Sequence, residues 1–167
     1  MNKIAKFICL LAFMLPGLLA HGQEDLNISK IFGDYGKQEG SVLIELAKDV
    51  LGNHTKINRY KSLIIPSDSS ILRTTREAIL NDFTQKENYG NGVILMESKK
   101  DGKVESATYA LGKEENSKVY EYILFMNKSK KMTLIYIKGN FPPQQLEEEL
   151  SKLKNLFIKV NDKRIKL

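Results

Sequence analysis

The stretch "GVILMESKKDGKVESATYAL", residues 92–111, decides the fold. Two runs suited to strands, Gly92–Ser98 and Lys103–Leu111, flank the dipeptide Asp101-Gly102. A two-residue hairpin turn needs a positive φ at both positions, and Asp-Gly is among the pairs that adopt it most readily. The stretch therefore predicts two antiparallel strands joined by a tight turn.

Two more strands are predicted directly after this hairpin. Lys118–Met126 and Met132–Lys138 are rich in aromatic and β-branched residues, and the segments "GKEENSK" and "NKSKK" connect them to the strands before them. Short connections between successive strands make neighbours antiparallel. The four strands therefore predict a meander.

Three elements are predicted before the meander. Residues 26–36 place apolar side chains at helical spacing, and Ile57–Ile65 has the pattern of a strand that Pro66 stops. Asp68-Ser69-Ser70 suits an N-cap, and residues 71–87 behind it predict an amphipathic helix. Its inner face carries Leu72, Thr75, Ile79 and Phe83, with Arg73, Arg76, Glu77 and Asp82 mostly off that face.

Residues 40–52 are compatible with a strand or a helix. The alternation of Val42, Ile44 and Leu46 is typical of a strand. Residues 43, 46, 47 and 50 are also apolar and fall at helical spacing, and Gly52-Asn53 is a suitable helix end. We favour a helix over most of the segment.

The last predicted helix begins at Pro142-Pro143, because a proline in the first turn of a helix loses no hydrogen bond. The tail "IKVNDKRIKL" is either a short strand or a frayed end. Together the elements predict an α+β fold, with a mainly antiparallel meander of four or five strands and helices packed on one face. The inner face of the last helix is expected to hold Leu146, Leu150, Leu153 and Phe157.

Residues 1–22 have the pattern of a cleaved signal peptide. Lys3 and Lys6 precede the apolar run Ile8–Ala20, whose 13 residues would span only ~20 Å as a helix, short of the ~30 Å membrane core. Ala20-His21-Gly22 offers small residues for cleavage. We expect an exported protein of the periplasm or cell envelope, with one domain over residues 23–167 that does not span the membrane.

The composition excludes several classes of function. Cys9 lies too early in the apolar run for lipid attachment and is the only cysteine, so residues 23–167 exclude disulfides, thiol catalysis and thiolate metal sites. Loss of two lysines with the signal lowers the net charge from +6 to +4, with 24 basic and 20 acidic residues. This mild charge argues against a nucleic-acid partner.

No recognisable catalytic or metal site is present. His54 is the only histidine after the signal, whereas a tight metal site needs about three protein ligands. No G-x-S-x-G motif accompanies a serine, and Ser151 and Lys154 have the S-x-x-K spacing without its companion motifs. We therefore predict no catalytic residue, no metal and no cofactor.

Tyrosines form one candidate binding surface. If the "NKSKK" hairpin centres on Ser129, Tyr122 faces Tyr136 across the ladder, with Tyr120 on the same face. Such an aromatic stripe could stack on a sugar or peptide, or it could belong to the core under the helices.

Lysines in the first and third turns of the meander form a second candidate binding surface. Alternate turns of a meander lie at the same end of the sheet, while Glu114 and Glu115 in the second turn lie at the other end, near Glu87. The lysines predict a positive patch for an acidic envelope protein, a glycan or lipid head groups, although turn lysines also simply keep hairpins soluble. The patch consists of Lys99, Lys100, Lys103, Lys128, Lys130 and Lys131.

The order of these segments resembles a known family. "IFGDYGKQEG", "YKSLII", "NYGNGVILMESKKDGKVESATYALG", "VYEYILFMN" and "MTLIYIKGNFPPQQLEEEL" resemble, over residues 30–155, a small exported domain of unknown function that is widespread in Bacteroidota. The resemblance implies a fold and an envelope location but no catalytic residue. We expect a non-enzymatic binding or accessory module; the alternatives are a structural or assembly component of an envelope complex, or an enzyme of unrecognised type.

The signal pattern predicts the N-terminus of the exported protein. Cleavage after Gly22 would leave Gln23 first, and cleavage after Ala20 would leave His21 first. The intact mass of protein recovered from the periplasm or envelope measures this directly. A recovered chain that retains Cys9, or carries a lipid on it, would contradict the prediction.

Overall fold

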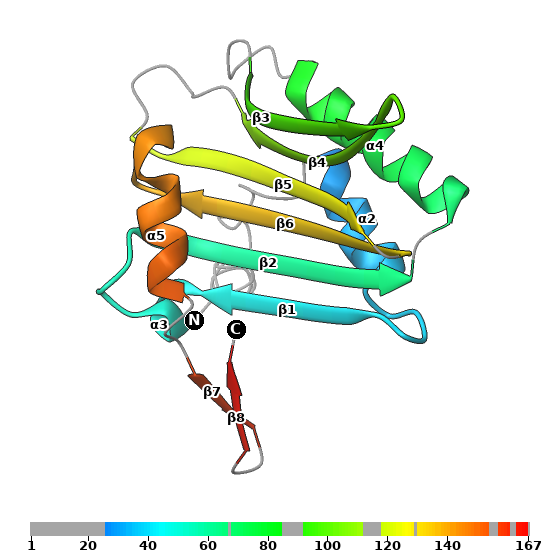
Figure 1. The fold of residues 1–167 in the computed structure, drawn as a ribbon. Coiled ribbons are helices and arrows are strands. Elements are labelled where there is room, and N and C mark those ends of the chain that lie inside the picture. Colours follow the sequence, from blue (N-terminus) through cyan, green and yellow to red (C-terminus); the bar gives the residue numbers. More distant parts are fainter. Residues whose placement is uncertain are drawn as a thin grey trace, which may run out of the picture.

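The computed structural model describes residues 26–66, 68–84, 92–111, 118–128, 130–153, 157–160 and 163–166. Its centre is a six-stranded antiparallel sheet with the strand order β1-β2-β6-β5-β4-β3 (Figure 1). The predicted meander is confirmed from the third strand to the sixth. The strands are β1 (Val42–Ala47), β2 (Ile57–Pro66), β3 (Val93–Lys100), β4 (Lys103–Ala110), β5 (Tyr120–Lys128) and β6 (Lys131–Gly139).

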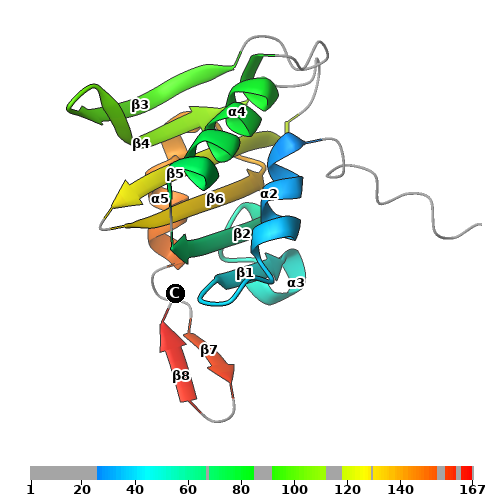
Figure 2. The same cartoon turned by 90° about the vertical axis from the view of Figure 1, so that its right-hand side faces the viewer.

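Helices lie on both faces of the sheet, so the expectation of a single helical face is wrong (Figures 1 and 2). Two helices, α2 (Asn27–Tyr35) and α4 (Ser69–Thr84), cover one face. On the opposite face lies α5 (Leu146–Leu153), which follows the 3₁₀ turn η1 (Pro143–Gln145). The last helix therefore ends before Phe157, which instead begins the separate hairpin of β7 (Phe157–Val160) and β8 (Lys163–Lys166).

The two-sided arrangement follows from the apolar residues of the central strands. Successive side chains of a strand point to opposite faces. Ile123 and Phe125 of β5 therefore pack under α2 and α4, whereas Tyr122 packs on the other face with Ile137 of β6. Because β5 and β6 carry apolar side chains on both faces, helices must pack on each face to shield these side chains from water.

The sheet has six strands, not four or five, because residues 42–47 form a strand. Our preference for a helix there is wrong; only α3 (Lys48–Leu51), a single turn, is helical. β1 pairs with β2 from Val42 opposite Ile64 to Ala47 opposite Arg59, which satisfies the backbone groups along the outer side of β2.

The tight turn predicted at Asp101-Gly102 is confirmed. Asp101 has φ 50° and Gly102 has φ 73°, the positive values that the two-residue turn requires. The turn joins Lys100 of β3 to Lys103 of β4 as a directly opposed pair.

Helix α4 begins as predicted, since the Asp68 carboxylate accepts a hydrogen bond from the Ile71 amide at 2.8 Å. Thr75 and Ile79 are buried as expected, and Leu72 and Phe83 are partly buried. Asp82, which we placed mostly off the inner face, is also buried.

The buried Asp82 carboxylate caps α2. It accepts hydrogen bonds from the amides of Asn27 at 2.6 Å and Ile28 at 2.9 Å, and from the Asn27 side chain at 2.9 Å. Leu26 precedes α2 and cannot supply a side-chain cap. The first amides of a helix have no partner within it, so a carboxylate from α4 takes this role.

We predict that Asp82→Ala lowers the free energy of unfolding by about 1–3 kcal/mol, because it leaves buried amides unpaired. Urea unfolding followed by circular dichroism measures the change. Asp34→Ala, which removes an exposed carboxylate from α2, the helix that Asp82 caps, is the matched control and should remain near the wild-type value. Equal stabilities of the two variants would contradict the cap.

A second buried carboxylate, Glu149, ties α5 to the loop before β2. It accepts hydrogen bonds from the Thr55 hydroxyl and the Lys56 amide, both at 2.8 Å, and Lys152 approaches its other oxygen at 2.6 Å. Burial alone raises the pKa of Glu149, but hydrogen bonds from Lys152, Lys56 and Thr55 outweigh burial and the net shift is downward.

This shift predicts acid sensitivity. The pKa of Glu149 lies below its ordinary value of 4.5 in the folded chain, so its stabilisation is complete above that value and is lost as the pH falls through the folded pKa. We expect the unfolding free energy of the wild type to fall below about pH 5 more steeply than that of Glu149→Gln. Glu147→Gln, at an exposed site on α5, should keep the wild-type slope. Parallel curves for Glu149→Gln and wild type would refute this role.

Candidate functional site

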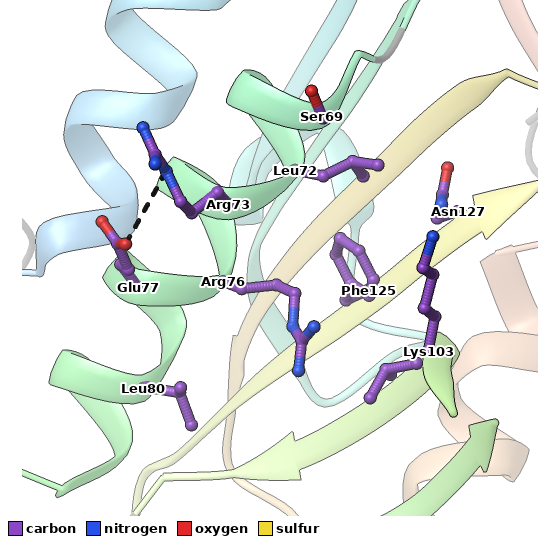
Figure 3. Close-up of a pocket in the computed structure, with 10 residues that line it drawn as sticks. Ser69, Leu72, Arg73, Arg76, Glu77, Leu80, Lys103, Phe125 and Asn127 are labelled. Atoms are coloured by element: carbon purple, nitrogen blue, oxygen red, sulfur yellow. Dashed lines mark ion pairs between the residues drawn. The ribbon is translucent and has the colours of Figure 1, made fainter. Parts of the chain in front are cut away.

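A groove opens between α4 and the adjoining parts of β4 and β5 (Figure 3). Its volume is about 400 Å³. Small-molecule sites typically measure ~300–1,000 Å³. The lining residues are Ser69, Leu72, Arg73, Arg76, Glu77 and Leu80 of α4, Lys103 and Val104 of β4, and Phe125 and Asn127 of β5.

The floor of the groove is apolar. Val104 and Phe125 are buried in the core under α2 and α4, and Leu72 packs against that core. Leu80, two turns further along α4, is 47% exposed. The groove therefore offers apolar surface that solvent and a ligand can reach.

The rim of the groove is cationic. Figure 3 shows Arg76 extending from α4, with Phe125 between it and Lys103. Within the described part of the chain, neither Arg76 nor Lys103 has a carboxylate at ion-pair distance. The one ion pair at the rim, between Arg73 and Glu77, spans 4.0 Å and is largely exposed, so it contributes little.

Beyond the groove lining, aromatic packing holds the end of α4 on the sheet. Phe83 of α4 meets Tyr109 of β4 edge to face, with ring centroids 5.5 Å apart. Burial and the nearby Glu97 raise the pKa of the Tyr109 hydroxyl, while Arg76 and Lys99 oppose the shift. Tyr109 therefore stays protonated and neutral, and it does not offset the charge of Arg76.

The two lysine-bearing turns lie at the same end of the sheet, as the meander predicts. β4 and β5 are antiparallel with Ser106 opposite Met126, so the turn before β4 adjoins the turn after β5. Lys103 belongs to both the predicted lysine patch and the groove. Lys99 is paired with Glu97 at 2.6 Å. Glu87, Glu114 and Glu115 lie outside the described residues.

The predicted pairing of Tyr122 with Tyr136 is wrong because the hairpin register differs by one residue. The β5–β6 pairing sets Tyr122 opposite Ile137 and Ile123 opposite Tyr136. A shift of one residue reverses the faces. Tyr122 and Tyr136 are consequently buried in different cores, on opposite sides of the sheet.

Tyr120 and Tyr122 do share a face, as expected, and belong to packing around α5. Their rings stack at 6.5 Å, and Tyr122 stacks on Phe141 at 5.3 Å. The Tyr122 hydroxyl donates a hydrogen bond to the Phe141 carbonyl at 2.6 Å. Burial, and next the neighbouring Tyr120, raise the pKa of Tyr122. Tyr122 therefore acts as a core residue that fixes the segment leading into α5.

The remaining sequence candidates are scattered. His54 is exposed in the loop after α3, and no cluster of three or more possible metal ligands occurs among the described residues. The Ser151 hydroxyl donates to the Glu148 carbonyl at 2.7 Å, an ordinary bond within α5. Lys154 lies outside the described residues.

The groove itself was not predicted from the sequence. Arg76 was placed correctly off the buried face of α4, but Phe125 and Lys103 come from strands far along the chain. One feature of the sequence did point to this surface, because Leu80 is an apolar residue outside the predicted inner face of α4.

Within the part of the chain that the structure describes, no helix is both long and apolar enough to cross a membrane. No curated protein and no solved structure matches the chain. A family model does match, over residues 15–150, which covers most of the chain and most of the segment that showed the resemblance. The chain therefore belongs to DUF6108, a family of unknown function.

Proposed function

We propose that this protein is a binding module of the bacterial cell envelope that holds an anionic ligand with an apolar portion in the groove beside α4. The observation that carries the proposal is the pair of cations, Arg76 and Lys103, flanking the apolar floor around Phe125. Export is part of the proposal, and its support is the signal pattern of residues 1–22 and the resemblance to exported Bacteroidota domains.

The two parts of the groove select complementary parts of a ligand. An anionic head group gains charge-assisted hydrogen bonds from guanidinium and ammonium groups, which are stronger than neutral ones. An alkyl or aromatic part covers Leu80 and the accessible part of Leu72, with a gain of roughly 25 cal/mol per Å² of apolar surface removed from water. A purely ionic ligand would leave the apolar lining uncovered.

The lining favours binding over catalysis. Among the described residues that line it, the uncharged polar groups are Ser69 and Asn127, and the single carboxylate, Glu77, pairs with Arg73. A nucleophile activated by an adjacent base requires a hydrogen-bonded pair of such groups. The described lining residues provide cations and apolar surface instead.

Octanoate and 1-octanol separate the two contributions. We expect wild-type protein to bind octanoate at low ionic strength, and Arg76→Gln/Lys103→Gln to bind it at least tenfold more weakly, equivalent to ~1.4 kcal/mol. Binding of 1-octanol should be unchanged in this variant. Lys30→Gln/Lys37→Gln removes two exposed charges elsewhere and is the matched control. Titration calorimetry measures all of these affinities.

Two results would contradict a ligand site in the groove. One is failure of the wild type to bind octanoate, and the other is an octanoate affinity of Arg76→Gln/Lys103→Gln equal to that of the wild type. Replacement of Lys99, Lys100, Lys128 and Lys130 by Ser tests the turn lysines in the same series. If these lysines form a separate anionic site, this variant loses salt-sensitive binding to phosphatidylglycerol vesicles but still binds octanoate. Unchanged vesicle binding would leave them a role in solubility only.

A further inference from the structure

Strand β3 is an edge strand whose side chains are exposed along its whole length. It pairs with β4 on one side, and no other strand pairs with it among the described residues. All eight of its residues are exposed. Four consecutive apolar ones begin the strand: Val93 at 57%, Ile94 at 49%, Leu95 at 38% and Met96 at 56% exposure.

The two halves of this edge differ in how they meet solvent. An exposed edge presents unpaired N–H and C=O groups, and proteins usually protect it with charges, prolines or bulges. Lys99 and Lys100 protect the second half. The apolar first half carries no charge and no proline, and its only irregularity in the pairing with β4 is the register shift between Ile94 and Met96. A row of backbone groups flanked by apolar side chains is the surface that strand addition uses.

We propose that β3 binds an extended segment of a partner protein, which adds to the sheet as a seventh, antiparallel strand. Every pairing in the six-stranded sheet is antiparallel, so the twist of this edge suits an antiparallel addition. Charge sets the chemistry of the partner. Acidic residues lie opposite Lys99 and Lys100, and apolar residues lie opposite Val93 to Met96. Read along its own chain, the segment is acidic first and apolar afterwards.

A second copy of β3 does not meet this requirement. Two-fold antiparallel pairing centred between Met96 and Glu97 would set Lys99 and Lys100 opposite Ile94 and Val93 of the other copy. Each lysine would then cover an apolar side chain and find no carboxylate directly across the ladder, where opposed charges contribute most. The registers that do set Glu97 of the other copy opposite Lys99 or Lys100 pair only residues 96–100 or 97–100, and they leave most of the apolar half of β3 without a partner strand. The charge pattern therefore favours a different chain.

The lysines differ in their availability. The acidic residue of the partner that meets Lys99 competes with Glu97, which lies 2.6 Å from the Lys99 ammonium group. No carboxylate of the described residues pairs with Lys100, so Lys100 makes the larger contribution. The docking edge shares no residue with the groove lining, and the two sites can be tested separately.

The probe is a synthetic peptide in which two glutamates precede alternating valine and threonine residues. We expect it to bind the full chain at low salt and to slow amide hydrogen exchange in β3. Methylation of alternate backbone nitrogens of the peptide should abolish binding, because it removes the N–H donors and keeps the side chains. Lys99→Glu/Lys100→Glu should weaken binding at least tenfold, and this variant should bind the same peptide with lysines in place of glutamates.

Lys30→Glu/Lys37→Glu makes the same change of charge at exposed sites away from β3 and should bind the probe like wild type. Circular dichroism of both variants confirms that each is folded. Equal binding of the methylated peptide would overturn strand addition, and so would no binding of the unmodified probe. Equal affinity of the Lys99→Glu/Lys100→Glu variant would overturn the acidic partner. A concentration-dependent dimer that protects β3 amides without any peptide would identify a second copy as the occupant and overturn the proposal.

Discussion

The central strands β5 and β6 are buried on both faces, and the rest of the molecule depends on this constraint. Their consecutive side chains alternate between two cores, so that Ile123 and Tyr122 lie on opposite sides of the sheet. One core requires the cover of α2 and α4, and the other requires α5 with Phe141. The edge strands are less constrained, which is why exposed apolar residues remain on β3.

Two buried carboxylates connect the layers that this constraint creates. Asp82 of α4 binds amides at the start of α2, 54 and 55 residues earlier in the chain, and Glu149 of α5 binds the Lys56 amide, 93 residues earlier. Each satisfies backbone groups that a distant element leaves unpaired. Asp82 also fixes the helix that forms one wall of the groove. The position of Arg76 thus depends on a contact on the other side of the same helix.

Local chemistry explains which features could be predicted. Three predicted features are confirmed because they depend on neighbours in the chain: the Asp101-Gly102 turn, the Asp68 cap and the order of the meander. The face of Tyr136 depends on whether a hairpin loop has two residues or three, a difference that periodicity does not reveal. The strand at 42–47 exists because β2 offers it an edge, and Asp82 and Glu149 are buried because of partners far along the chain. Such features follow from tertiary contacts, which no local pattern contains.

The division of tyrosines between the two cores gives the protein a pair of built-in optical reporters. The chain has seven tyrosines and no tryptophan, so tyrosines dominate its near-ultraviolet absorption and emission. Tyr109 and Tyr136 lie in the core under α4, to which the groove residue Phe125 also belongs, whereas Tyr122 and the partly buried Tyr120 lie in the core under α5. Spectral changes at the first pair would follow events at the groove, and changes at the second would follow the seating of α5. With the tyrosines of one core replaced by phenylalanine, those of the other core report on their own side of the sheet without an added label.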